Sequence, residues 1–158
     1  YKVEIFKAYA PYYFDYKEKL LCIVSAINLV KLLTAESQSN VNVFNLISDL
    51  YLIFNNDDWV KEYIFWELKL LEIVGFNLQL NKIAKSEVIN NEKKYFVGSN
   101  SEKKYIPNFL IDRDEKKLDK KTVSKALKLV GDFLEKNVLK PNNISYPNSR
   151  LEFVNLFK

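Results

Sequence analysis

Apolar residues recur every three or four positions along most of the chain, the spacing that places them on one face of an α-helix. This pattern predicts helices at residues 16–33, 41–54, 59–74 and 118–139, and a short last helix at 149–157. In the first helix, we expect a buried face formed by Leu20, Ile23, Val24, Ile27, Val30 and Leu33. The second and fourth helices carry similar stripes, with Val43, Leu46, Ile47, Leu50 and Phe54 in the second and Val123, Leu127, Val130, Phe133, Leu134 and Val138 in the fourth.

The helix at 59–74 differs from the others because apolar residues cover most of its circumference. Such a helix is surrounded by other helices, so we predict that it forms the centre of a bundle. Gly75 follows it and is expected to end it in a left-handed conformation, which costs glycine nothing. Short polar side chains precede the predicted helices, and those that we expect to act as N-caps are Asp15, Asp57 or Asp58, Asp119, and Asn148 or Ser149.

Residues 81–118 lack helical periodicity. Within them, "KKYFV" and "EKKYI" flank the turn-forming stretch "GSNS", which predicts a β-hairpin. Near the start, "KVEIF" alternates apolar and charged residues and predicts a short strand. The predicted fold class is therefore mainly α: a helical bundle around a central apolar helix, with a small irregular or β-hairpin insert.

Composition narrows the class of protein further. A chain of 158 residues fits one domain, and only 3 glycines and 4 prolines argue against a turn-rich, all-β fold. No charge-free apolar run of about 18 residues exists, so no membrane span is expected. The single cysteine, Cys22, excludes an intrachain disulfide and favours a reducing compartment such as the cytoplasm, and we expect it to be buried and inert.

Positive charge is concentrated in the second half of the sequence. Residues 1–81 contain 7 basic and 10 acidic residues, whereas residues 82–140 contain 15 basic and 9 acidic residues. A basic region of this kind attracts polyanions or acidic peptides. The alternative is a solvated, lysine-rich face.

The chemistry of most enzymes is missing. The chain has no histidine, no cysteine cluster and no glycine-rich phosphate loop. Its paired carboxylates, Asp57 with Asp58 and Asp112 with Asp114, fall where caps and turns are expected. We therefore expect neither an enzyme nor a metal or cofactor site.

Several segments resemble the DNA repair protein RecO family. "WELKLLEIVGFNLQL" is similar to the family's aromatic–Glu–Leu–basic–Leu–Leu segment followed by Gly-Phe. "KKYIPNFL" resembles its Leu-Pro-x-Phe-Leu turn, and "NSRLEF" its Ser-Arg start of the last helix. Glu36 is similar to one residue of a Pro-Glu pair upstream. The motifs occur in the family's order over nearly the whole chain, in the alphaproteobacterial style.

The resemblance implies a recombination mediator that works with RecR, single-stranded-DNA-binding protein and DNA, helps to load RecA, anneals strands and associates with the nucleoid. It assigns residues 1–14 to the last strand and linker of an N-terminal OB-fold, and residues 15–158 to the helical domain with an insert at about 81–118. The rest of the OB-fold is expected to be missing. Some members have a four-cysteine zinc knuckle, but here Ile83 stands at the first ligand position, so no zinc is expected.

The resemblance also implies a docking site on the helical domain for the acidic, Phe-ending tail of single-stranded-DNA-binding protein. Such a site needs an apolar pocket and cations. Lys69 and Arg150 are the candidates. The alternative for Lys69 is a pair with Glu72 or Glu62, and the alternative for Arg150 is a structural ion pair or a bond to helix-end carbonyls.

Two groups of residues are candidates for nucleic-acid contacts. The phosphate-binding candidates are Lys120, Lys121, Lys125 and Lys128, and those of the hairpin are Lys93 and Lys94, with Lys103 and Lys104 nearby. Tyr95, Phe96 and Tyr105 are candidates for base stacking, or alternatively pack the hairpin onto the bundle. A helical adaptor that binds only protein is the alternative to the mediator.

Overall fold

The computed structural model describes residues 10–36, 38–99, 102–113 and 117–158. The strand predicted at "KVEIF" lies outside the described residues; of the segment assigned to an OB-fold remnant, only residues 10–14 are described, with the 3₁₀ turn η1 at Ala10–Tyr13. The larger helices are α1 (Lys17–Leu33), α2 (Val41–Ile53), α3 (Trp59–Ile73), α6 (Lys120–Leu134) and α7 (Asn148–Asn155). A π-helical turn η2 (Glu135–Leu139) and a 3₁₀ turn η3 (Lys140–Asn142) continue α6. The fold is therefore mainly α, as predicted.

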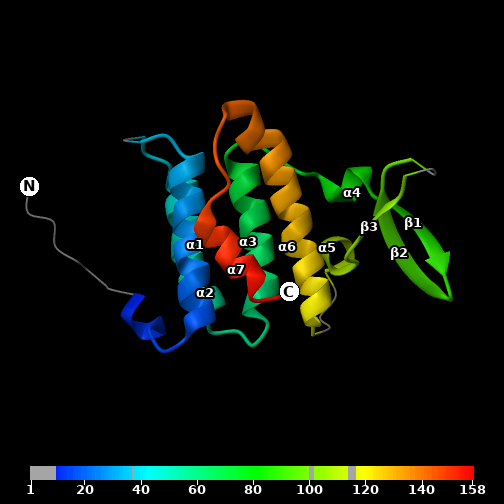
Figure 1. Cartoon of the computed structure of the whole chain (residues 1–158), viewed down its shortest axis with the longest axis horizontal. Helices are drawn as coiled ribbons and strands as arrows, with labels where there is room; N and C mark the ends of the chain where they lie inside the picture. The colour runs from blue at the N-terminus through cyan, green and yellow to red at the C-terminus, as the bar shows by residue number, and fades with distance from the viewer. Residues whose placement is uncertain (1–9, 37, 100–101, 114–116) are drawn as a thin grey trace, which may run out of the picture.

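The helices form a bundle around α3, and a small sheet lies at one end (Figure 1). Helix α3 packs against α2 and α6, and α7 packs against α1 and α6. Buried residues occur on several sides of α3, among them Tyr63, Ile64, Trp66, Leu70 and Leu71. The central position predicted for this helix is confirmed.

The buried face of α1 differs from the predicted one. Val24 is 43% exposed, whereas Cys22 and Ala26 are fully buried. Small side chains that are not strongly apolar also lie on the buried face of α1; an example is Ser25, whose Oγ is 3.4 Å from the hydroxyl of Tyr63 on α3. A periodicity read only from large apolar residues misses these positions, because close helix packing selects for small side chains as well as apolar ones.

The ends of the helices agree only partly with the predicted caps. Asp119 caps α6 as predicted, since its Oδ1 accepts a hydrogen bond from Thr122 N at 2.7 Å. Asp58 stands at the N-cap of α3 but makes no side-chain cap bond. The predictions for α1 and α7 were wrong, because the N-cap positions are occupied by Tyr16 and Pro147.

Gly75 ends α3 as predicted, with φ at +93°. Its N–H donates to Glu72 O at 3.1 Å, and the next N–H, of Phe76, donates to Leu71 O at 2.7 Å. This pair of bonds is the Schellman motif, which requires a left-handed residue at the position of the glycine. The motif turns the chain sharply after α3, towards the pocket described below.

The insert contains an antiparallel sheet in the order β1 (Lys85–Ile89), β2 (Glu92–Val97), β3 (Lys104–Ile106). The β2–β3 hairpin was predicted, but β1 and the short helices α4 (Leu80–Ile83) and α5 (Phe109–Asp112) were not. Asn90 and Asn91 join β1 to β2 with φ at +52° and +62°, as in a type I′ hairpin turn. The charged, mostly exposed β1 gives no alternating apolar signal, and its pairing with β2 makes it a strand.

Candidate binding surfaces

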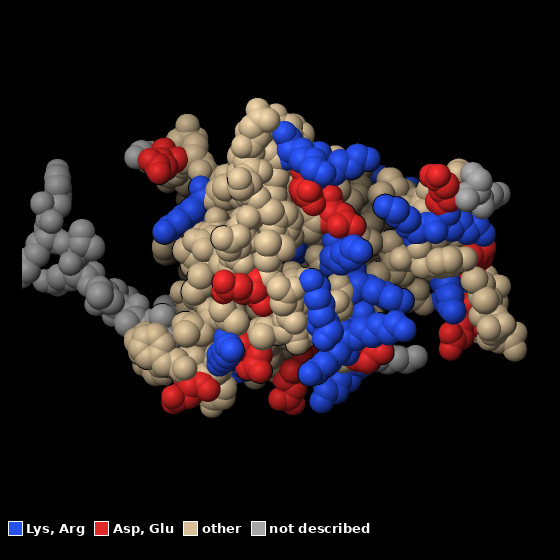
Figure 2. All heavy atoms as spheres, viewed as in Figure 1, with Lys and Arg blue, Asp and Glu red and all other residues tan. Residues whose placement is uncertain are grey.

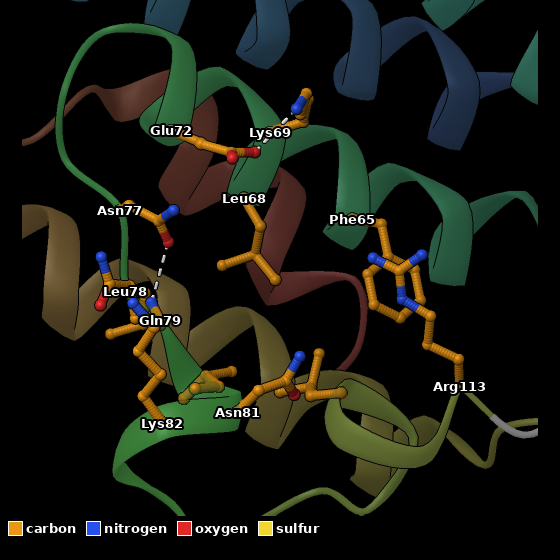
Figure 3. Close-up of a pocket in the computed structure, with 12 residues that line it drawn as sticks. Phe65, Leu68, Lys69, Glu72, Asn77, Leu78, Gln79, Asn81, Lys82 and Arg113 are labelled. Carbon is orange, nitrogen blue, oxygen red and sulfur yellow. Dashed lines mark hydrogen bonds and ion pairs between the residues drawn. The ribbon is translucent and has the colours of Figure 1, made fainter.

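A pocket of about 340 Å³ lies between α3, α4 and α5 (Figure 3). The Schellman turn after α3 brings residues 77–82 back alongside the helix. The rim is fixed by Asn77, whose Oδ1 accepts a hydrogen bond from Gln79 N at 2.9 Å, and by the left-handed φ of +44° at Gln79. The pocket is lined by Phe65, Leu68, Lys69, Glu72, Asn77, Leu78, Gln79, Leu80, Asn81, Lys82, Leu110 and Arg113.

The lining of this pocket combines an apolar floor with cations. Phe65, Leu68, Leu78, Leu80 and Leu110 belong to the hydrophobic core or pack against it. The positive side chains are Lys69, Lys82 and Arg113. Apolar lining with a few charged groups is the usual composition of a site for a small or peptide ligand.

Lys69 lies at the rim of the pocket, where it is paired with Glu72. Its Nζ is 2.8 Å from Glu72 Oε2, and the two side chains are 57% and 46% exposed. This is one of the ion pairs that we considered as the alternative role of Lys69. An exposed pair of this kind is weak, so it leaves the lysine available to a ligand.

Sequence reasoning missed Arg113, the other arginine of the chain. It follows α5 in a left-handed conformation, with φ at +50°. Its guanidinium carbon lies 5.2 Å from the centroid of the Phe65 ring, so the cation rests on the pocket floor. The one feature of the sequence that could have pointed to Arg113 is the rarity of arginine, since the chain contains only two.

Arg150 is not in this pocket, which corrects the expectation of a docking role. Its side chain is 1% exposed. Nη2 lies 2.7 Å from Glu67 Oε2 and Nε lies 3.0 Å from Glu67 Oε1, and Nη2 also donates to Leu127 O at 3.0 Å. The contacts are those of the alternative that we considered, a structural ion pair that also bonds a helix carbonyl.

The Arg150–Glu67 pair is part of a buried polar network. Tyr63 donates to Glu67 Oε1 at 2.7 Å, and Arg150 Nη1 bonds the hydroxyl of Tyr146. The neighbouring Glu67 carboxylate and the hydrogen bond that it accepts raise the pKa of Arg150 above its ordinary value, against the effect of burial. Burial, with the nearby Glu67 charge, raises the pKa of the Tyr63 hydroxyl. The network fastens α7 to α3 and α6.

A second hollow is a larger groove of about 1030 Å³ between the sheet, α5 and the start of α6. It brings together lysines that are far apart in the sequence: Lys93 and Lys94 from β2, Lys125 from α6, and Lys117, which sequence reasoning missed. Its walls also carry three carboxylates, of which Asp112 accepts a hydrogen bond from Tyr95 and Asp119 caps α6; the third is Glu92.

The other candidate lysines lie outside this groove. Lys120, Lys121 and Lys128 are exposed on α6. In Figure 2, basic side chains gather over α6 and the sheet, while the part of the surface over α1 is mostly uncharged. The concentration of positive charge seen in the sequence is thus also a concentration in space.

Two of the three candidate stacking aromatics are buried. Tyr95 is 7% exposed and Phe96 is 4% exposed, so their rings pack within the protein. Tyr105 is 50% exposed, but its ring meets Phe96 edge-on and its hydroxyl donates to Glu87 Oε1 at 2.6 Å. The alternative that we considered, packing of the hairpin onto the bundle, describes Tyr95, which belongs to the hydrophobic core. Phe96 lies outside that core and is covered by Tyr105 and Lys103.

Within the residues that the structure describes, no group of three or more His, Cys, Asp or Glu side chains is placed to hold a metal ion. In the same part of the chain, no helix is long and apolar enough to cross a membrane. Cys22 is fully buried, and burial raises the pKa of its thiol.

The structure is a mainly helical domain with two open hollows that are lined by charged side chains. The family described as "Recombination protein O C terminal" matches residues 17–145. The chain therefore belongs to this family of RecO C-terminal domains, in agreement with the resemblance of its motifs.

Similar proteins share the family name. The chain is 33% identical to the DNA repair protein RecO of Rickettsia canadensis over 100 residues, 63% of this chain and 41% of that protein. It is 23% identical to that of Rhodospirillum centenum over 154 residues, 89% of this chain and 61% of the relative. It is 27% identical to that of Rickettsia akari, over 97% of this chain and 68% of the relative. The chain thus spans from two fifths to two thirds of the length of these relatives, and no solved structure matches it.

Proposed function

We propose that this chain is the helical, partner-binding part of a recombination mediator in DNA repair. In this role it binds DNA, the tail of single-stranded-DNA-binding protein and RecR, and so helps to load RecA and anneal strands. Family membership and the names of the similar proteins support the repair role. Binding and positioning, not bond-making, are the proposed activity, and no cofactor is assigned.

The observation that carries the proposal is the pocket between α3, α4 and α5. An acidic peptide that ends in phenylalanine needs an apolar cavity for its ring and cations for its carboxylates. The pocket offers Phe65, Leu68 and Leu110 for the ring, and Lys69, Lys82 and Arg113 for the charges. Lys69 thus keeps its proposed role, and Arg113 replaces Arg150 as the arginine of the site, because an arginine can hold a carboxylate through two bonds.

The proposal is tested by titrating the chain with a fluorescent, aspartate-rich peptide of eight residues that ends in phenylalanine. We expect binding that Arg113→Ala weakens about tenfold, the size of a charge-assisted hydrogen bond. Lys69→Ala should weaken it less, because Lys69 is already paired. Lys17→Ala on α1 removes the same charge away from the pocket and serves as the control. A folded chain that does not bind the peptide contradicts the proposal.

We also propose that the basic surface over α6 and the sheet binds DNA phosphates. The lysines assigned to this surface are Lys93, Lys94, Lys120, Lys121, Lys125 and Lys128. All of them except the partly buried Lys94 are exposed, and Lys93, Lys94 and Lys125 line one groove; both observations support the assignment. Peptide binding without any salt-dependent DNA binding favours the alternative, an adaptor that binds only protein.

A further inference from the structure

The pocket proposed for the acidic peptide contains a carboxylate of its own. Glu72 lies one helical turn from Lys69 on α3, and both side chains line the pocket. Figure 3 shows the pair at the edge of the pocket nearest α3, with the Glu72 carboxylate turned to the Lys69 ammonium. An incoming carboxylate therefore meets Lys69 with a partner already in place.

The other two cations of the pocket, Arg113 and Lys82, differ from Lys69 in their pairing. Among the described residues, no ion pair is formed by Arg113 or Lys82. Arg113 instead rests on the ring of Phe65. The pocket thus has two cations open to a ligand and one held by an internal acid.

We infer that Glu72 is the specificity-determining residue of this pocket, an internal carboxylate that competes with acidic ligands for Lys69. This inference rests on the proposed function. A ligand that takes Lys69 leaves Glu72 unpaired beside a like charge, so that exchange alone brings little gain in affinity. Affinity comes from the carboxylates that reach Arg113 or Lys82. Glu72 therefore selects ligands with several carboxylates over ligands with one.

The exposure of the pair fits a competitor that can be displaced. Both side chains are about half exposed, so water and salt screen the pair and it opens readily. A buried acid would hold its ion pair with Lys69 too firmly for a ligand to displace it. An exposed one only lowers the affinity, and the same exposure makes its effect depend on ionic strength.

The test is a comparison of Glu72→Gln with the wild-type chain in the titration with the aspartate-rich peptide. Glutamine keeps the shape of the side chain and removes its charge. At low salt, we expect Glu72→Gln to bind the peptide about two- to fivefold more tightly, the range expected for an exposed ion pair. The gain should shrink at high salt. Lys69→Ala should cost more affinity in the Glu72→Gln chain than in the wild-type chain.

Two controls separate this effect from a change in overall charge. Glu62→Gln removes the same charge from the exposed surface of α3 away from the pocket, and it should leave the affinity unchanged. A peptide with asparagine for aspartate and an amidated end should bind wild type and Glu72→Gln equally. Binding by wild type with no gain in Glu72→Gln overturns this inference alone. Failure of both chains to bind the peptide overturns the proposed function as well.

Discussion

At the scale of single residues, the two arginines of the chain have opposite roles. Arg150 is buried against Glu67, Tyr146 and a backbone carbonyl, whereas Arg113 lies at an open pocket. The close approach of Arg150 to α6 depends on a glycine. A Cβ atom at Gly131 would lie 2.5 Å from Tyr146 Oη and 2.6 Å from Arg150 Nη1. A side chain at this position would force the Tyr146 hydroxyl and the Arg150 guanidinium to shift within their buried network.

Replacing the two arginines separately should show this difference in stability. Arg150→Ala leaves the buried Glu67 carboxylate without its cation, which costs about 3–5 kcal/mol of unfolding free energy. Arg113→Ala removes an exposed side chain and should change it by about 0.5 kcal/mol or less. Urea denaturation measures both values. Equal losses in the two variants would contradict the structural role of Arg150.

At the scale of elements, the outer strands of the sheet are tied together across β2. Glu87 of β1 pairs with Lys103 and accepts a hydrogen bond from Tyr105 of β3. These residues lie over Phe96, with Lys103 Nζ 4.7 Å from its ring centroid. The hydrogen bond from Lys103, followed by that from Tyr105, holds the pKa of Glu87 below its ordinary value. The stabilisation that Glu87 gives to the sheet through Lys103 and Tyr105 therefore depends on pH.

The sign of this pH dependence follows from the lowered pKa. A carboxylate with a lowered pKa stabilises the folded sheet at pH values above its ordinary pKa of 4.5, and this contribution is lost as the pH falls through the lowered value. We expect faster amide hydrogen exchange in β3 below about pH 4, relative to the intrinsic rate. In Glu87→Gln this acid-induced change should be absent. An unchanged acid response in that variant would show that another group is responsible.

At the scale of the whole molecule, α5 separates the two hollows. Leu110 and Arg113 line the pocket between α3, α4 and α5, while Phe109 and Asp112 line the groove. The groove divides the candidate DNA-binding lysines into those that line it and those that do not. The division separates two possible modes of DNA binding: a single strand that follows the groove, or a strand attracted to the whole basic surface without a fixed path.

Two double variants of equal charge test that division. Lys93→Ala with Lys125→Ala changes the groove, and Lys120→Ala with Lys128→Ala changes the exposed surface of α6. If a single strand follows the groove, the first pair should lower the slope of log affinity against log salt by about 1.4, since each phosphate contact contributes about 0.7. The second pair should lower it less. Equal slopes would indicate a diffuse basic surface, and the slopes are measured by titrating a labelled oligonucleotide at several salt concentrations.

The sequence by itself determined the helical class, the central position of α3, the Gly75 stop and the Asp119 cap. These features follow from helical periodicity and from the backbone preferences of single residues, and both can be read from residues that are close together in the sequence. The β2–β3 hairpin and the family resemblance came from the same local signals.

Only the tertiary structure decided which charged side chains are buried and which are accessible to a ligand. Arg150 and Lys69 are both cations in a helical region of the sequence, but one is buried by contacts with residues up to 83 positions away and the other lies at a pocket rim. Arg113 joins that pocket because α5 packs beside α4 and α3, and β1 is a strand because β2 pairs with it. Burial and pairing are properties of residues distant in the chain, so a local pattern does not contain them.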